Sequence, residues 1–251
     1  IGEFYANLKD WDKAQAAFTD VYQAKLFVVK EPELRDQARL RAMTARYDAF
    51  KEKGIIPQDL KAVKLQSPKK KLPADVVEWI KWVDEVAAQK TSQPEVMDQL
   101  LFEANRVVYA HGDVELAYRR MLSYVGTRPN SKLTPAVCAL IIDTLIQSEA
   151  WVATRTLAIK FQEMPNVAVG DFKKKLVQLE RDAHYKITMG VYRNKDYAKA
   201  RAFGEEHLKL YPDSKYKVEI LAMLGKASLE LKDTDASLGY MNQVIRLDPN
   251  N

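Results

Sequence analysis

Apolar residues recur every three or four positions in almost every segment between the prolines, as they do on one face of an α-helix. Four such stripes are Phe18, Val21, Tyr22 and Lys25; Leu34, Ala38, Ala42, Ala45 and Ala49; Val76, Ile80, Val83 and Ala87; and Leu101, Ala104 and Val108. The first stripe predicts a helix over about residues 12–30. The surrounding residues are mostly Ala, Leu, Lys, Glu, Gln and Arg, which favour helix. No segment alternates over strand length, so the pattern predicts an all-α protein.

One long stretch lacks this periodicity. It follows Gly54, a typical helix C-terminal residue, and contains three prolines and the run Lys69 to Lys71. It is either a linker or an extended loop laid over the helices, and we favour the linker. The predicted division is an N-terminal helical segment over residues 1–54, a Pro- and Lys-rich segment over 55–73, and a repeat domain over 74–251.

A spacing repeats along the chain, in which a small residue is followed twelve positions later by proline. The pairs are Ala117 and Pro129, Ala153 and Pro165, Ala200 and Pro212, and Ser237 and Pro249. The small residues are 36, 47 and 37 positions apart. A tight turn and a further helical stripe precede each one. The excess of 11 in the second interval equals three helical turns, so we expect one long first helix over residues 168–193.

This pattern resembles the tetratricopeptide repeat family, whose period is about 34 residues. The best match is residues 192–212, where Asp196, Tyr197, Ala200 and Pro212 fall on motif positions, whereas Gly204 and His207 depart from the motif. At the N-terminus the resemblance is carried by Gly2, Tyr5, Trp11, Ala14 and Phe18. It implies an α-solenoid, that is, a superhelix of antiparallel helix pairs. The expected structural positions are Ala14, Ala117, Pro129, Ala153, Pro165, Ala200, Pro212 and Pro249, because small residues permit close helix contacts and proline ends a helix.

In this family the first helix of each pair lines an inner groove. The positions 15, 11 and 8 residues before each small residue therefore predict a partner-binding groove made of Phe102, Arg106, Tyr109, Ile142, Tyr185, Met189, Tyr192 and Lys226. The same count gives Cys138, Leu145, Ala222 and Leu229. An aromatic groove with a few cations suits an extended peptide or a helix. The alternative is that much of this stripe is core. The resemblance implies a non-catalytic protein–protein interaction scaffold.

The charge distribution suggests a second hypothesis. The net charge is 39 − 34 = +5, and the segment from Lys51 to Lys71 has seven lysines and two acidic residues. This segment could bind an acidic polymer or an anionic membrane surface. A nucleic-acid module carries a denser basic stripe, so we expect no nucleic-acid partner.

Residues for chemistry are sparse. His111, His184 and His207 lack metal-ligand spacing, and the single cysteine, Cys138, lies in an apolar helical stretch with no charged activator nearby. No glycine-rich phosphate loop is present, and no apolar run is long enough to span a membrane. We therefore expect no metal, no cofactor, no enzymatic activity and no transmembrane segment. Trp79 and Trp82 share a helical face, either in the core or as an exposed aromatic patch.

A weaker resemblance concerns the compartment. The phrase YPDSKY, from Tyr211 to Tyr216, is similar to inter-repeat links of bacterial outer-membrane assembly lipoproteins, and residues 151–216 are similar to envelope repeat proteins of deltaproteobacterial gliding-motility complexes. This implies the periplasm or cell envelope of a bacterium, with the cytoplasm as the alternative. The chain begins at Ile1 without Met, which is typical of a fragment or a processed product. No pattern indicates the oligomeric state.

Overall fold

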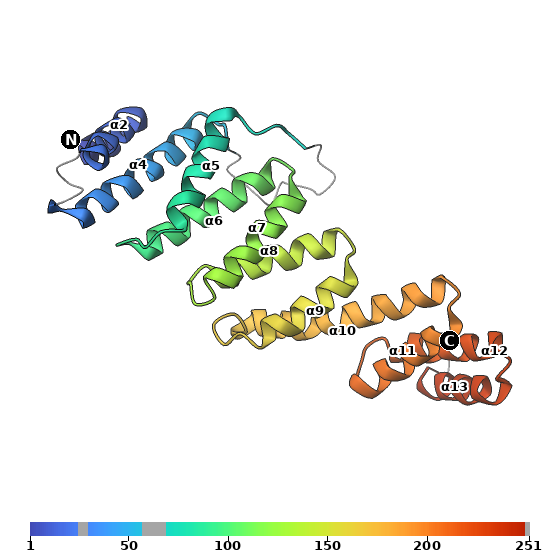
Figure 1. Cartoon of the computed structure of the whole chain (residues 1–251). Helices are drawn as coiled ribbons and strands as arrows, with labels where there is room; N and C mark the ends of the chain where they lie inside the picture. Colours follow the sequence, from blue (N-terminus) through green and yellow to red (C-terminus); the bar gives the residue numbers. More distant parts are fainter. Residues whose placement is uncertain (25–29, 57–68, 249–251) are drawn as a thin grey trace. The chain divides into compact units, whose positions relative to one another are not determined.

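The computed structural model describes residues 1–24, 30–56 and 69–248, and α-helix is the regular structure in all three ranges (Figure 1). The chain divides into two compact units, Ile1–Thr144 and Leu145–Asn251. Unit 1 contains α1 (Gly2–Asn7), α2 (Trp11–Gln23), α4 (Pro32–Glu52), α5 (Ala74–Ala87), α6 (Pro94–Ala110) and α7 (Val114–Thr127), and α8 (Thr134–Gln147) crosses the division. Unit 2 contains α9 (Trp151–Gln162), α10 (Gly170–Arg193), α11 (Tyr197–Leu210), α12 (Lys217–Glu230) and α13 (Thr234–Leu247). The all-α prediction is confirmed for the described residues.

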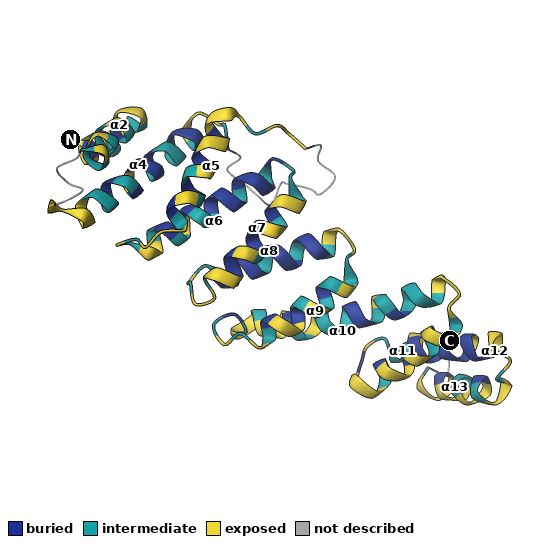
Figure 2. Ribbon diagram, in the orientation of Figure 1, coloured by how far each residue is buried: buried dark blue, intermediate teal, exposed yellow. Residues whose placement is uncertain are grey.

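Within each unit, helices pack against their neighbours in sequence. In unit 1, α2 packs on α1 and α4, and α6 packs on α4, α5 and α7. In unit 2, α10 packs on α9, α11 and α12, and α12 packs on α11 and α13. Buried residues follow the inner faces of α4, α6 and α12 (Figure 2). This serial packing is the solenoid-like arrangement that the resemblance implies, because no helix pair buries its apolar face alone.

Trp79 anchors the core of unit 1. Its side chain is fully buried, and its indole Nε1–H donates a hydrogen bond to the Met43 carbonyl oxygen at 3.0 Å. The Tyr47 ring stacks on it at 5.4 Å, and the Phe50 ring meets it edge-on at 6.2 Å. Trp82 is half-buried, 5.8 Å from the Tyr22 ring. Trp79 is therefore a core residue and not part of an exposed aromatic patch, which were the two interpretations of this tryptophan pair.

Four of the described helices, α2, α7, α11 and α13, begin with one recurring turn. An aspartate at the N-cap accepts a hydrogen bond from the backbone N–H three residues later, and the residue before it has positive φ. The pairs of preceding residue and N-cap are Lys9 and Asp10, Gly112 and Asp113, Lys195 and Asp196, and Lys232 and Asp233. Helix α9 starts in the same way at Glu149 and Ala150, without the capping carboxylate. The turn fixes where the second helix begins in the pairs that contain it.

One predicted small-residue position differs by one residue in the structure. Ala14, Ala117 and Ala200 are each the fourth residue of their helix and are fully buried. In α9 the fourth residue is Thr154, which is fully buried, whereas Ala153 is half-buried. The small-residue position of this repeat is therefore Thr154. A threonine fits here because its Oγ1–H donates a hydrogen bond to the Ala150 carbonyl at 3.0 Å, so the hydroxyl is satisfied inside the contact.

The second helices end just before the predicted prolines. Arg128, Tyr211 and Asp248 are C-cap residues with φ of −132°, −132° and −139°, outside the helical range. Such values are expected for a residue before proline, whose ring disfavours helical geometry at the preceding position. Pro129 and Pro212 follow directly and are exposed, and Pro165 lies two residues beyond Glu163, the C-cap of α9. Pro249 lies outside the described residues.

The predicted long first helix is present as α10, Gly170–Arg193, and α4 ends as expected before Gly54, which has φ of +66°. The helix expected over residues 12–30 is shorter than predicted. Helix α2 ends at Gln23, and Ala24 is extended, with φ of −62° and ψ of 118°. Arg35 of α4 donates from Nε to the Tyr22 carbonyl at 2.8 Å, so a tertiary contact satisfies this helix end.

Part of the proline-rich segment is described. The Lys70 backbone N–H donates to the His111 carbonyl at 2.8 Å, and the Lys69 ammonium lies 2.6 Å from the Asp113 carboxylate. This end of the segment therefore rests on the turn between α6 and α7. Residues 57–68 lie outside the described residues, and the division at 54 and 73 stays a prediction. No helix in the described ranges is long and apolar enough to cross a membrane.

Candidate partner-binding surface

Three of the predicted groove residues form one stripe on α10. Tyr185, Met189 and Tyr192 lie four and three positions apart, on the same helical face. All three are half-buried, and they pack against a buried cluster made of Ala200, Ile220, Met223, Leu224 and Ala227. The inner part of each side chain is therefore fixed by the core, while the outer part faces solvent.

Tyr216, just before α12, completes this stripe. Its ring stacks on that of Tyr185, with centroids 3.8 Å apart and ring planes 5° apart. The Tyr185 hydroxyl donates a hydrogen bond to the Glu219 carboxylate, and burial together with this carboxylate raises the pKa of Tyr185 to about 12. The hydroxyl therefore stays protonated at physiological pH. We call Tyr185, Met189, Tyr192 and Tyr216 the tyrosine surface.

The edges of the tyrosine surface are polar. The Lys215 ammonium lies 4.8 Å above the Tyr216 ring, and Lys226 of α12 is exposed. At the far end, the rings of Tyr192 and Tyr197 are 5.8 Å apart at 60°. Counting positions from the small residues could not find Tyr216, because it lies outside the helices. Its only signal was its place at the end of the YPDSKY phrase.

A smaller surface lies on α6 in unit 1. Phe102 and Arg106 are both half-buried, with the Arg106 guanidinium 5.6 Å from the Phe102 ring centroid. Arg106 also contacts both oxygens of the buried Glu103 carboxylate at 3.1 Å, and the Tyr47 hydroxyl donates to that carboxylate at 2.5 Å. Arg106 is thus held in place by its own unit.

Two predicted groove residues belong instead to the core. Tyr109 is 5% exposed and Ile142 is fully buried, as is Cys138. Part of the reason is the one-residue register error at Ala153. Counting from Thr154 instead gives Ala139, Asp143 and Ile146, which are all half-buried. A shift of one residue rotates a helical position by about 100°, enough to move a side chain from the groove face into the core.

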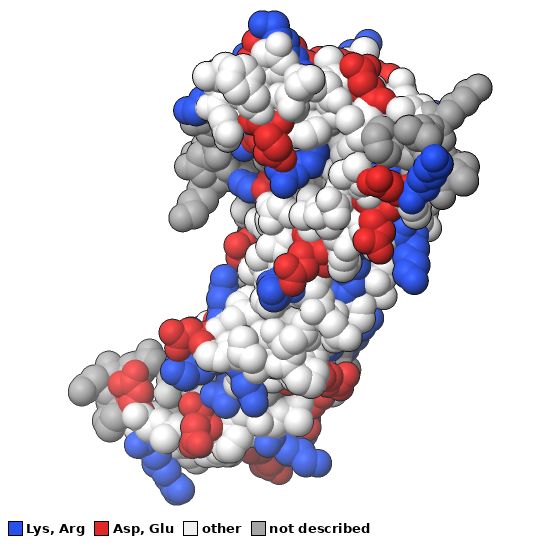
Figure 3. Space-filling model, turned by 90° about the vertical axis from the view of Figure 1, so that its left-hand side faces the viewer, with Lys and Arg blue, Asp and Glu red and all other residues white. Residues whose placement is uncertain are grey.

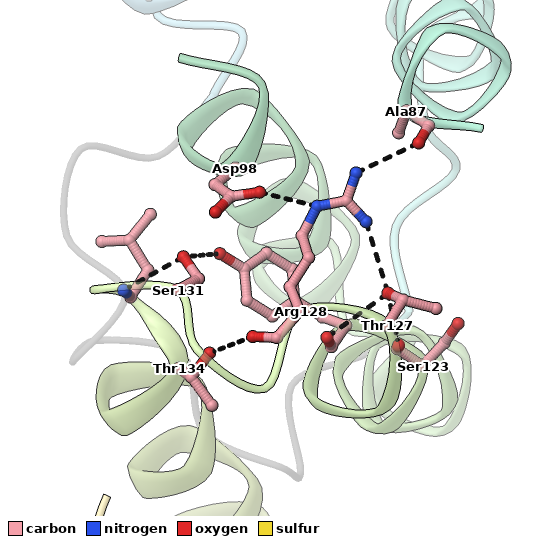
Figure 4. A network of polar contacts seen from close by, with 9 residues as sticks. Ala87, Asp98, Ser123, Thr127, Arg128, Ser131 and Thr134 are labelled. Atoms are coloured by element: carbon pink, nitrogen blue, oxygen red, sulfur yellow. Dashed lines mark hydrogen bonds and ion pairs between the residues drawn. The ribbon is translucent and has the colours of Figure 1, made fainter. Parts of the chain in front are cut away.

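Arg128 organises a polar junction between α5, α6 and α8 (Figure 4). Its Nε donates to the Asp98 carboxylate at 2.6 Å, and Nη2 donates to the Ala87 carbonyl at 3.1 Å. The Arg128 carbonyl accepts from Thr134 Oγ1 at 2.6 Å. Arg128 and Asp98 line an open cavity of about 720 Å³. These contacts tie Arg128 to α5, α6 and α8, so the junction joins neighbouring repeats.

The described residues contain no group of three or more His, Cys, Asp or Glu side chains that could hold a metal ion. Burial raises the pKa of the Cys138 thiol to about 12, so it is protonated and a poor nucleophile at neutral pH.

Three of the five described lysines of the basic segment are paired with carboxylates. Lys51 contacts Asp48, Lys53 contacts Asp12 and Lys69 contacts Asp113. On the face that Figure 3 shows, basic and acidic side chains are interspersed. Lys61 and Lys64 lie outside the described residues, so binding of an acidic polymer or a membrane through Lys51 to Lys71 stays a prediction.

Residues 218–251, which include most of α12 and all of α13, match the family model described as Tetratricopeptide repeat. This C-terminal segment is therefore similar to a tetratricopeptide repeat. For these residues the match confirms the resemblance that the repeat spacing predicted. Tetratricopeptide repeats in general mediate protein–protein interactions and are non-catalytic.

No curated protein matches the chain. Among solved structures, the C-terminal part of a TPR repeat-containing protein from Cytophaga hutchinsonii is similar, at 14% sequence identity and a TM-score of 0.35, over 100% of this chain and 95% of that one.

Proposed function

We propose that the protein is a non-catalytic scaffold that binds a peptide or a helix of a partner protein on the tyrosine surface of unit 2. The observation that carries this proposal is the stack of Tyr185 on Tyr216, beside Met189 and Tyr192. These side chains are already ordered by their contacts with the core, so binding restricts them little further. Tyrosine is among the residue types that dominate binding energy at protein interfaces.

The polar groups around the tyrosine surface indicate the chemistry of the ligand. The rings and the Met189 thioether favour apolar or aromatic ligand side chains. The Lys215 ammonium, 4.8 Å above the Tyr216 ring, favours an acidic ligand residue at that edge. The Glu219 carboxylate already accepts from Tyr185, so it favours a ligand that leaves this contact intact.

Selection of peptides from a displayed random library against the whole protein would test the proposal. The affinity of the selected peptides would then be measured for the wild type and for the Tyr185→Ala and Tyr192→Ala variants. We expect a loss of affinity of about 10- to 100-fold in each variant, as for an interface residue of high energetic weight. Tyr240→Ala is the matched control, because Tyr240 is also half-buried against the same core cluster but lies on the second helix, α13. Unchanged affinity in Tyr185→Ala and Tyr192→Ala would contradict the proposal.

We propose further that the scaffold works in the periplasm or envelope of a bacterium. The support is the resemblance of residues 211–216 and 151–216 to envelope repeat proteins. Fractionation of cells that express the full-length gene, followed by immunodetection, tests this. Recovery in the cytoplasmic fraction alone would contradict it.

A further inference from the structure

Two histidines meet inside unit 2, at the contact between α10 and α11. His184 is 3% exposed and His207 is fully buried. Their Nδ1 atoms are 3.2 Å apart, within hydrogen-bond distance. His207 is also one of the two residues that depart from the tetratricopeptide motif, at a position where that motif prefers a small side chain. Neither histidine is part of the tyrosine surface.

The outer nitrogens of the pair have different surroundings. His207 Nε2 lies 2.9 Å from the Ser214 hydroxyl oxygen, which also accepts the Tyr216 N–H at 3.2 Å. His184 Nε2 lies 3.8 Å from a Glu206 carboxylate oxygen. The Tyr211 ring covers both imidazoles, with centroids 5.8 Å from His184 and 5.0 Å from His207.

This geometry limits the number of protons that the pair can hold. One proton fits between the two Nδ1 atoms, donated by one ring and accepted by the other. In the neutral pair, the ring that accepts at Nδ1 carries its own hydrogen on Nε2. One added proton then leaves both rings with an outer Nε2–H, that of His207 toward Ser214 and that of His184 toward Glu206, and the shared Nδ1 proton stays in place. When both rings are imidazolium, both Nδ1 atoms carry hydrogen and oppose each other at 3.2 Å. That state cannot keep the contact.

Charged groups from each packed helix face the pair. Arg155 of α9 lies 3.9 Å from the Glu206 carboxylate of α11, and Glu180 of α10 accepts from the Tyr211 hydroxyl at 2.8 Å. Burial and then the charge of Arg155 lower the pKa of His184, against the opposing effects of Glu206 and Glu180. Burial, His184 and Arg155 lower the pKa of His207 to about 4. The packed pair therefore binds fewer protons than two imidazoles in water.

We propose that the His184–His207 pair is an acid-operated switch: α10 stays packed on α11 while the pair holds at most one proton between its Nδ1 atoms, and the contact opens when both rings are protonated. The sign follows from proton linkage. Since the packed state has the lower affinity for protons, packing is fully favoured above the pKa of free histidine, about 6.5, and is weakened as the pH falls from there toward 4.

NMR of the whole protein tests the switch. The imidazole signals of His184 and His207 and the amide signals of α10 and α11 are followed from pH 7.5 to 4.5, and urea unfolding of unit 2 is measured at each pH. Opening that takes up two protons increases the opening equilibrium constant by about 100-fold per pH unit, and by about 10-fold if one proton is taken up. We expect a value between these limits below pH 6.5 for the wild type.

The variants separate the pair from general effects of acid. In H184Q/H207Q the added pH dependence of unit 2 should disappear. His111→Gln is the matched control, because His111 is a buried histidine of unit 1 whose Nδ1 contacts the Val107 carbonyl of its own helix, and it should leave the response of unit 2 unchanged. An unaltered pH response in H184Q/H207Q would overturn the proposal. If that variant does not fold, the wild-type titration decides: two imidazolium rings with α10 and α11 still packed would overturn the proposal equally.

Discussion

Arg120 of α7 donates two hydrogen bonds to Asp84 of α5, with N–O distances of 2.6 and 2.7 Å. Its Nε also donates to the Asn105 side-chain oxygen of α6 at 2.9 Å. One guanidinium thus joins three helices of unit 1. Asp84 and Arg120 are 36 positions apart, which is about one repeat, so the contact connects corresponding parts of neighbouring repeats.

Replacing Arg120 by lysine should lower the free energy of unfolding of unit 1 by about 1–3 kcal/mol. An ammonium cannot bind both carboxylate oxygens and Asn105 together, and Asn105 is buried. Urea unfolding monitored by tryptophan fluorescence measures this. The adjacent Arg119 is mostly exposed, 3.8 Å from Glu115, so R119K should change stability by less than about 0.5 kcal/mol. Equal effects of the two substitutions would contradict the assigned role of Arg120.

Ala150→Asp should stabilise unit 2 by about 1 kcal/mol. Ala150 has φ of −78° and ψ of 61°, close to −81° and 73° at Asp196, but it lacks the side-chain acceptor. A carboxylate there can accept the backbone N–H of Ala153, as Asp196 accepts that of Lys199. The reverse change, Asp196→Ala, should cost about 1 kcal/mol. Chemical denaturation of the two variants checks both signs, and a destabilising Ala150→Asp would show that the turn before α9 differs from the others.

Two glycines should respond differently to alanine. Gly239 lies inside α13, and an added Cβ meets nothing within 4 Å, so Gly239→Ala should raise the free energy of unfolding by about 0.5–1 kcal/mol through helix propensity. At Gly204 an added Cβ would lie 2.8 Å from side-chain atoms of both Leu224 and Met223. These must move, so Gly204→Ala should yield a smaller gain or a loss. Thermal unfolding of the two variants measures the difference, and a larger gain at Gly204 would contradict the close packing of α11 on α12.

Cys138 should be unreactive in the folded protein. Its side chain is fully buried, and burial raises its pKa to about 12, so thiolate is scarce at pH 8. Labelling with a disulfide reagent should therefore be slow in buffer and fast in denaturant. Rapid labelling of the native protein would show that α8 opens easily.

The local part of the fold could be predicted because its causes are local. Three local signals recur along the chain: an aspartate at the N-cap, a positive-φ residue before it and a proline after the second helix. Each acts over only a few residues. The repeat spacing placed Tyr185, Met189 and Tyr192 on one face of α10, where all three are half-buried. It failed by one residue at Ala153, because Pro165 lies two residues beyond the C-cap of α9 whereas Pro129 and Pro212 directly follow theirs. Counting from Ala153 consequently placed Ile142 in the groove, although it is buried.

The sequence by itself determined the all-α class, the helix pairs with readable repeat spacing and the long α10, since these depend on periodicity and on residues close together in the chain. Only the tertiary structure decided which side chains meet. Tyr216 on Tyr185, and His207 against His184, join residues 31 and 23 positions apart on different elements. Such contacts depend on how far each helix extends and on how it is rotated against its neighbour. A shift of one residue rotates the helix face by about 100° and so changes which side chains make these contacts.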